Sequence, residues 1–169
     1  NKFADMIFVF SDYWKQNLIE MGIPENKIDI LYHGFDDNIF YPIDKIIARE
    51  KFNFKPDDFI ILNTNRNNYR KAIDKTIDAF IKFLKIKDCN KNIKLFLNMD
   101  CSERPEQTGY DILNLIKISC IKNNLDYNDV INNHIFKSNS HFSDEMMNYL
   151  YNACDIGINT RSEEHTSEL

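Results

Sequence analysis

The 169-residue sequence contains little glycine and little proline, four residues of each, and a single tryptophan. No apolar run approaches the roughly 20 residues that a membrane-spanning helix needs, and no signal peptide with a basic start and an apolar middle is present. No integral membrane segment is therefore expected, and a cytoplasmic location is the default expectation. Hydrophobic residues make up 43% of the sequence and aromatic residues 13%, which is enough apolar surface for a core.

A surplus of positive charge is also missing, because the formal net charge is -5. Nucleic-acid-binding proteins usually carry a basic face that displaces counterions from phosphate, so nucleic acid is not an expected partner. The four cysteines are widely spaced, with no CxxC pair and no histidine at ligand spacing, so neither a zinc site nor a disulfide framework is predicted. They are expected to be reduced thiols: Cys89, Cys101, Cys120 and Cys154.

The last nine residues, 161–169 (RSEEHTSEL), break abruptly from the apolar stretch DIGINT and carry no hydrophobic periodicity. They resemble the translation of a common short-read sequencing adapter, so we interpret them as a non-native tail with Thr160 as the last authentic residue. A natural polar tail is the alternative. The chain also begins at Asn1 without a methionine, and its true N-terminus is expected to be missing.

Short apolar runs alternate with amphipathic segments along the rest of the chain. The expected strands are 6–10, 28–32, 59–64, 93–99, 130–136 and 155–160. The expected helices are 12–22, 71–86, 110–123 and 143–152, with a short helix and linker at 43–58. In the turn between the second strand and this linker, Gly34 permits a positive φ.

Strands that alternate with helices of about 10 to 16 residues predict right-handed crossovers and a parallel sheet covered on both faces. We therefore expect an α/β fold with a Rossmann-like parallel sheet. In such a sheet, ligands bind beyond the carboxyl ends of the strands, so the loop after the strand 59–64 is the first candidate site.

That loop reads NRNNYRK and combines three cations with several amide groups. The candidates are Asn65, Arg66, Asn67, Asn68, Arg70 and Lys71. The next helix begins there with its positive dipole end, so the loop is a plausible seat for a diphosphate in an otherwise acidic protein. A solvated basic loop is the alternative, and the loop alone favours it because an arginine and a lysine at this spacing are common by chance.

Three segments of the chain resemble group 1 glycosyltransferases, which are retaining enzymes with the GT-B fold. The stretch 4–40 is similar to their hinge region, and the matching motif is His33, Gly34, Phe35, Asp36 and Phe40. The second domain of this family opens with a strand, an arginine and, five residues later, a lysine before a helix. Arg66 and Lys71 fall on those two positions, and the segment 142–160 is similar to a later helix and strand of the family, with Ala153 and Asp155 matching.

The resemblance implies how the chain is divided. Residues 1–42 would be the end of the N-terminal, acceptor-side domain and the hinge, and residues 43–58 a linker. Residues 59–160 would be part of the C-terminal, donor-binding domain, followed by the non-native tail 161–169.

The resemblance also implies a retaining, hexosyltransferase-type enzyme that moves a sugar from a nucleoside-diphosphate-sugar donor to an unknown acceptor. Arg66 and Lys71 would hold the diphosphate and assist its departure, and Asn65 and Asn67 would make lesser polar contacts. No metal or other cofactor is expected, because these cations take the role of a metal and the chain has no DxD motif.

The chain departs from the family pattern in three places. Ala72 stands where a glycine often follows the lysine, the segment NMDCSERPE replaces a glycine-rich turn, and the tail replaces a turn whose glutamate holds the donor sugar. This fragment is therefore expected to be inactive by itself. A nucleotide-binding module without transferase activity and a purely structural or interaction domain are the alternatives. Asp100 could line the cleft but is more often solvated at such a position, and His134 and His141 are expected to be structural or exposed.

Overall fold

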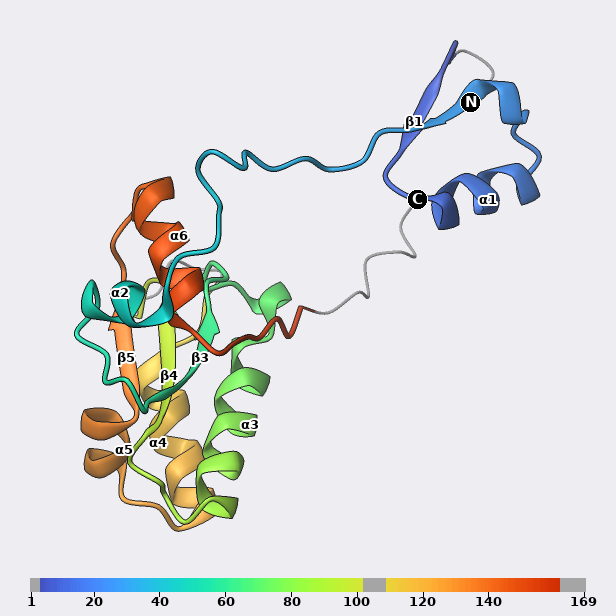
Figure 1. The fold of residues 1–169 in the computed structure, drawn as a ribbon. Coiled ribbons are helices and arrows are strands. Elements are labelled where there is room, and N and C mark those ends of the chain that lie inside the picture. Colours follow the sequence, from blue (N-terminus) through green and yellow to red (C-terminus); the bar gives the residue numbers. More distant parts are fainter. Residues whose placement is uncertain (1–3, 102–108, 162–169) are drawn as a thin grey trace. The chain divides into compact units, whose positions relative to one another are not determined.

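The computed structural model of the chain describes residues 4–101 and 109–161. It contains two compact units, residues 1–40 and residues 41–169, which are drawn in Figure 1 and are described separately below.

The smaller unit contains two short parallel strands and the helix between them. Its elements are β1 (Ile7–Val9), α1 (Asp12–Glu20), the 3-10 turn Glu25–Lys27 and β2 (Ile28–Ile30), with Ile7 paired with Ile28. The Ser11 side chain accepts a hydrogen bond from the backbone N–H of Trp14, as expected of an N-cap, and Gly22 leaves the helix with a φ of 88°. Gly34 does not adopt a positive φ. The segment turns instead around Asp36, whose carboxylate accepts from the N–H of Asn38 and whose carbonyl accepts from Phe40.

The larger unit is built on a parallel sheet with the strand order β5-β4-β3-β6. The strands are β3 (Phe59–Asn63), β4 (Ile93–Asn98), β5 (Ile135–Ser138) and β6 (Ile156–Gly157). The helices are α2 (Lys45–Glu50), α3 (Ile73–Ile86), α4 (Ile112–Asn123), α5 (Tyr127–Asn133) and α6 (Asp144–Ala153), with a 3-10 turn at Tyr69–Lys71. The predicted α/β fold with a parallel sheet is therefore confirmed.

Both faces of this sheet are covered, because successive side chains of a strand point to opposite faces. Ile61 packs in a core with α3 and α4, whereas its neighbours Ile60 and Leu62 pack in a second core with α2 and α6. The two helical layers lie on opposite sides of the strands in Figure 1. The inward face of α3 is the one that the sequence predicts, since these residues are all buried: Ile73, Ile77, Phe80, Ile81 and Leu84.

The prediction of a strand over 130–136 is wrong in its first half. Asp126 caps a helix at that point, and its carboxylate accepts from the N–H of Asp129 at 2.6 Å. Val130 is buried from α5, and β5 begins only at Ile135. Because a short apolar run has no periodicity that separates a strand from a buried turn of helix, the cap decides the structure here.

The segment 43–58, expected as a short helix and linker, contributes to the core of the larger unit. Its helix α2 packs against α6, and Ala48 is fully buried. Phe54 is also buried and stacks edge to face on Phe96 of β4. The segment therefore covers one face of the sheet.

Candidate functional site

A polar cavity of about 680 Å³ lies at the carboxyl ends of three neighbouring strands. Its lining comes from the loops after β3, β4 and β5: Thr64, Arg66, Asn67, Asn98, Met99, Asp100, Asn139, Ser140 and His141. Parallel strands bring their carboxyl ends to one edge of the sheet, so residues more than 70 positions apart meet here. We call this hollow the large cavity.

Arg66 is exposed and lines the large cavity, where the sequence predicts a cation for a phosphate ligand. Asp100 is also exposed and lines it, so the structure places this carboxylate in the cleft. His141 is exposed and lies there too. By contrast, His134 is fully buried, and its Nδ1 lies 2.8 Å from the carbonyl oxygen of Ile93, which is a structural position.

Asn67 borders the large cavity, but its side chain is committed to backbone contacts. Its Nδ2 donates to the carbonyls of Asp100 and Tyr110 at 3.0 and 2.8 Å, and its Oδ1 accepts from the N–H of Tyr110 at 2.9 Å. Gly109 packs directly against it, since a Cβ there would lie 3.0 Å from the Asn67 carbonyl oxygen. Asn67 thus ties the loop after β3 to the segment that leads into α4.

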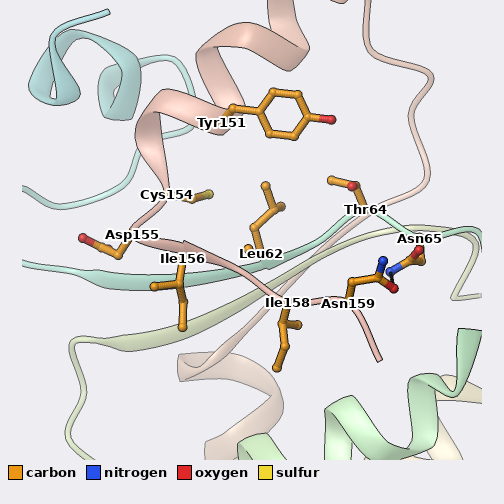
Figure 2. A pocket seen from close by; sticks show the side chains of 10 residues that line it. Leu62, Thr64, Asn65, Tyr151, Cys154, Asp155, Ile156, Ile158 and Asn159 are labelled. Carbon is orange, nitrogen blue, oxygen red and sulfur yellow. Dashed lines mark hydrogen bonds between the residues drawn. The ribbon is translucent and has the colours of Figure 1, made fainter. Parts of the chain in front are cut away.

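Asn65 lines a different and smaller cavity, of about 310 Å³, which Figure 2 shows beside β6. Its side-chain amide donates to Asn63 at 3.0 Å and to Asn159 at 3.3 Å. Thr64 lines both cavities, so the exit of β3 separates them. Leu62, Tyr151 and Ile158 supply the apolar side of the smaller cavity.

Lys71 ends the 3-10 turn that follows Arg66 and lines neither of these two cavities. The Lys71 side chain is half-buried, and its carbonyl accepts a hydrogen bond from the hydroxyl of Thr160 at 2.9 Å. The next residue, Ala72, has φ 47° and ψ 48°, which is the left-handed conformation. Glycine adopts this conformation without a steric cost. This agrees with the glycine that often follows the lysine in group 1 glycosyltransferases, where this chain has Ala72.

Tyr110 makes an aromatic contact with the same loop. No sequence motif predicts this contact. Its ring lies edge to face against Tyr69, with ring centroids 4.8 Å apart. Burial, together with a hydrogen bond to Asp74, raises the pKa of the Tyr110 phenol to about 12. The phenol therefore stays protonated at neutral pH and acts as a donor.

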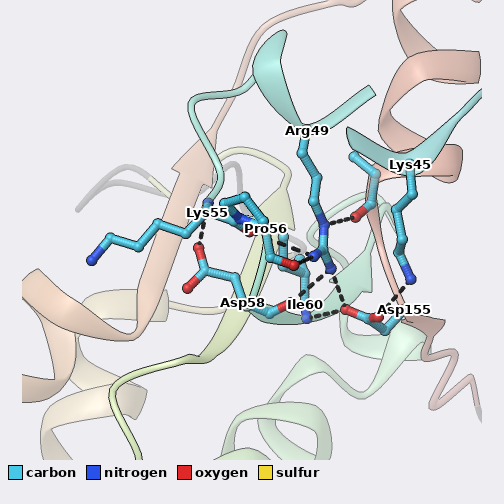
Figure 3. Close-up of polar contacts among 8 residues, drawn as sticks. Lys45, Arg49, Lys55, Pro56, Asp58, Ile60 and Asp155 are labelled. Atoms are coloured by element: carbon cyan, nitrogen blue, oxygen red, sulfur yellow. Dashed lines mark hydrogen bonds and ion pairs between the residues drawn. The ribbon is translucent and has the colours of Figure 1, made fainter. Parts of the chain in front are cut away.

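A second polar cluster lies at the opposite, amino-terminal edge of the sheet, and its centre is the buried Arg49 of α2 (Figure 3). The Arg49 guanidinium donates to the carbonyls of Ala153 at 3.1 Å and Asp58 at 2.7 Å, and to the carbonyl of Pro56. It also forms an ion pair with Asp155 at 2.9 Å. The arginine thus joins α2, the start of β3 and the end of α6.

Asp155 completes this cluster from the residue directly before β6. Its carboxylate accepts from Lys45 at 2.6 Å and from the backbone N–H of Ile60 at 2.7 Å. Burial alone would raise the pKa of this carboxyl, but the hydrogen bonds from Lys45 and Ile60 and the charge of Arg49 outweigh it and hold the pKa below its ordinary value. Sequence reasoning missed this cluster, because its partners are 106 residues apart.

Some classes of site find no support in the part of the chain that the structure describes. Across residues 4–101 and 109–161, no three His, Cys, Asp or Glu side chains are grouped closely enough to bind a metal ion. The helices within those ranges are too short or too polar to cross a membrane. The four cysteines are free, and burial raises the pKa of the Cys154 thiol to about 12.

No family model matches the chain, and no curated protein matches it closely. Solved structures do match it. HepE from Anabaena, solved in complex with UDP and glucose, is 19% identical with a TM-score of 0.55, and the match covers 95% of this chain and 39% of HepE. A glycosyltransferase from Rickettsia africae is 22% identical with a TM-score of 0.60, over 94% of this chain and 38% of that one.

The C-terminal domain of the group 1 glycosyltransferase LpcC from Francisella tularensis matches 73% of this chain and 57% of its own length, at 18% identity and a TM-score of 0.52. At these identities the matches establish the fold alone. The chain has the fold of part of a GT-B glycosyltransferase, including part of the C-terminal domain, and it spans about two fifths of the HepE and Rickettsia chains.

Proposed function

We propose that this chain is part of a retaining glycosyltransferase, and that its larger unit binds the nucleoside diphosphate of a sugar-nucleotide donor in the large cavity. The observation that carries the proposal is the position of Arg66. It is exposed at the exit of β3, a central strand, and lines a polar cavity at the carboxyl edge of a parallel sheet.

A diphosphate suits this cavity by charge and by hydrogen bonding. The Arg66 guanidinium offers a planar set of donors to phosphate oxygens, and Lys71, which does not line the cavity itself, follows five residues later on the same loop. Asn98, Asn139 and Ser140 supply neutral polar groups that suit a sugar or a base. Asp100 lines the same cavity, and its carboxylate disfavours a phosphate directly beside it, so the diphosphate is proposed to lie against Arg66.

The proposed chemistry follows from charge that builds up on the leaving diphosphate. As the bond between the sugar and the diphosphate breaks, negative charge grows on the bridging oxygen. A fixed cation stabilises that state more than the ground state, and this difference is what accelerates the step. Arg66 and Lys71 are the cations proposed for this role.

Transfer itself is proposed for a protein that contains this chain together with the remainder of a GT-B enzyme, since the matches cover about two fifths of HepE and of the Rickettsia enzyme. The donor is proposed to be a nucleoside-diphosphate sugar because the HepE structure holds UDP and glucose. Retention at the anomeric carbon is proposed from the resemblance to retaining enzymes. The anomeric configuration of the transfer product would test it.

The binding half of the proposal is tested by calorimetric titration of the chain with UDP and with pyrophosphate. Arg66→Ala should weaken both by about 10- to 100-fold, because a charge-assisted hydrogen bond contributes roughly 1.5 to 3 kcal/mol. Arg70→Ala is the matched control, because Arg70 is an exposed arginine of the same loop and lines neither cavity. The affinity of this variant for UDP and pyrophosphate should stay within about twofold of the wild type. Equal affinities of wild type and Arg66→Ala would contradict the site.

A further inference from the structure

We propose that Thr76 and Thr160 are positioning residues, whose hydroxyls form a directed chain of hydrogen bonds that fixes the turn between Lys71 and α3. This inference rests on the proposed function, because the residue that the turn positions is Lys71. No sequence motif assigns a role to either threonine.

The direction of the chain follows from Asn63, which is fully buried at the end of β3. Its Oδ1 faces the backbone N–H of Asn65 at 2.9 Å, and a backbone N–H can only donate. The atom on the other side of the amide is therefore Nδ2, which donates to Thr76 Oγ1 at 3.1 Å. The Asn63 side chain has one orientation only.

Each threonine hydroxyl then donates its single proton to the next hydrogen bond of the chain. Thr76 Oγ1 accepts from Asn63, so its own proton is available for Thr160 Oγ1, which lies 2.8 Å away. Thr160 in turn shares its one proton between the carbonyls of Lys71 and Ala72, both at 2.9 Å, in a bifurcated hydrogen bond. Asn63 and Thr76 are fully buried, so water does not compete for the hydrogen bond between them.

The last link of this chain lies at a strained turn. Ala72 is buried in the left-handed conformation, which costs an alanine free energy because its Cβ crowds the following carbonyl oxygen. Its carbonyl also accepts from the N–H of Lys75, in the first turn of α3. The Thr160 hydroxyl thus holds two successive carbonyls in the orientation that the turn requires.

The neighbour of Thr160 holds the other end of the same loop. Asn159 Oδ1 accepts from Asn65 Nδ2, next to Arg66, whereas Thr160 holds Lys71 and Ala72. Two consecutive residues after β6 therefore form hydrogen bonds with both ends of the loop that carries Arg66 and Lys71. This arrangement fixes the separation of the two cations that are proposed to share one diphosphate.

The first test needs no ligand and uses amide hydrogen exchange of the full chain, followed by NMR. Thr160→Val keeps the shape and removes the hydroxyl, so the amides of Ala72 and Lys75 should exchange about three- to tenfold faster. Thr160→Ser should restore the wild-type rates. Ser119→Ala is the matched control, since it removes a hydroxyl hydrogen bond to Asp78 farther along α3 and should leave the turn amides unchanged.

A double-mutant cycle separates support of the strained turn from a general loss of packing. Ala72→Gly removes the steric cost of the turn, so Thr160→Val should accelerate exchange of the Lys75 amide less in that background than in the wild type. Turn amides within about twofold of the wild type in Thr160→Val, no rescue by serine, or equal effects in both backgrounds would each overturn the hydroxyl chain.

The second test measures pyrophosphate affinity. Thr160→Val should weaken binding about three- to tenfold in the wild type and in Arg66→Ala, but have no further effect in Lys71→Ala, because it acts through Lys71. An equal loss in the Lys71→Ala background would overturn the positioning role. Failure of the wild type to bind pyrophosphate would contradict the proposed function instead, and the exchange measurements would still decide whether the hydroxyl chain exists.

Discussion

The two edges of the larger sheet use arginine in opposite ways. At the amino-terminal edge, Arg49 is 5% exposed, and its guanidinium donates to four backbone carbonyls and one carboxylate of its own chain. At the carboxyl edge, Arg66 is exposed and lines the large cavity. The first arginine therefore stabilises the fold, and the second is the one that we propose binds a ligand.

The largest expected effect is the loss of the buried arginine. Arg49→Met leaves the Asp155 carboxylate and several carbonyls without their donor, so the free energy of unfolding should fall by about 3 to 5 kcal/mol. Urea unfolding followed by circular dichroism measures this. Lys45→Met removes the exposed partner of the same carboxylate and should cost only about 0.2 to 1 kcal/mol. Equal losses in the two variants would remove the distinction between a buried and an exposed cation.

A smaller effect concerns pH and the same amino-terminal edge. The pKa of Asp155 is held below its ordinary value of 3.8, so its contribution to stability is complete above the unfolded pKa and is lost as pH falls through the folded pKa. Asp155→Asn should therefore be less stable than the wild type by about 1 to 3 kcal/mol at pH 7. The difference should shrink as pH falls below 3.8. A difference that stays constant over that range would show that the charge of Asp155 contributes nothing.

The smallest effect is expected at the carboxyl edge, in the turn before α3. Ala72→Gly relieves the left-handed strain but adds freedom to the unfolded chain, so stability should change by a gain of at most about 1 kcal/mol. Ala79→Gly, at an exposed position inside α3, should instead lose about 1 kcal/mol. Thermal unfolding measures the stability of both variants. A loss of stability in Ala72→Gly as large as that in Ala79→Gly would contradict the claim that Ala72 is strained.

The sequence predicts those parts of this comparison that depend on local periodicity. The spacing of Ile73, Ile77 and Leu84 predicts the buried face of α3, and the rule for parallel sheets locates Arg66 at the carboxyl edge, where it lines the large cavity. Helix α5 was missed because a short apolar run fits a helix and a strand equally well. The cluster around Arg49 and the bonds from Thr160 to the loop were missed because their partners are distant in sequence, 106 and 88 or 89 residues away.

We propose that the carboxyl edge of the larger sheet binds the ligand and that the amino-terminal edge stabilises the fold. The most direct test is to titrate the isotope-labelled chain with UDP and record backbone amide shifts by NMR. Saturable shifts are expected around the large cavity, in residues 64–72, 98–100 and 139–141, while the amides of Lys45 and Arg49 stay unchanged. The absence of saturable shifts at the carboxyl edge, or shifts confined to the Arg49 cluster, would contradict the proposal that this unit binds the nucleoside diphosphate of a sugar donor.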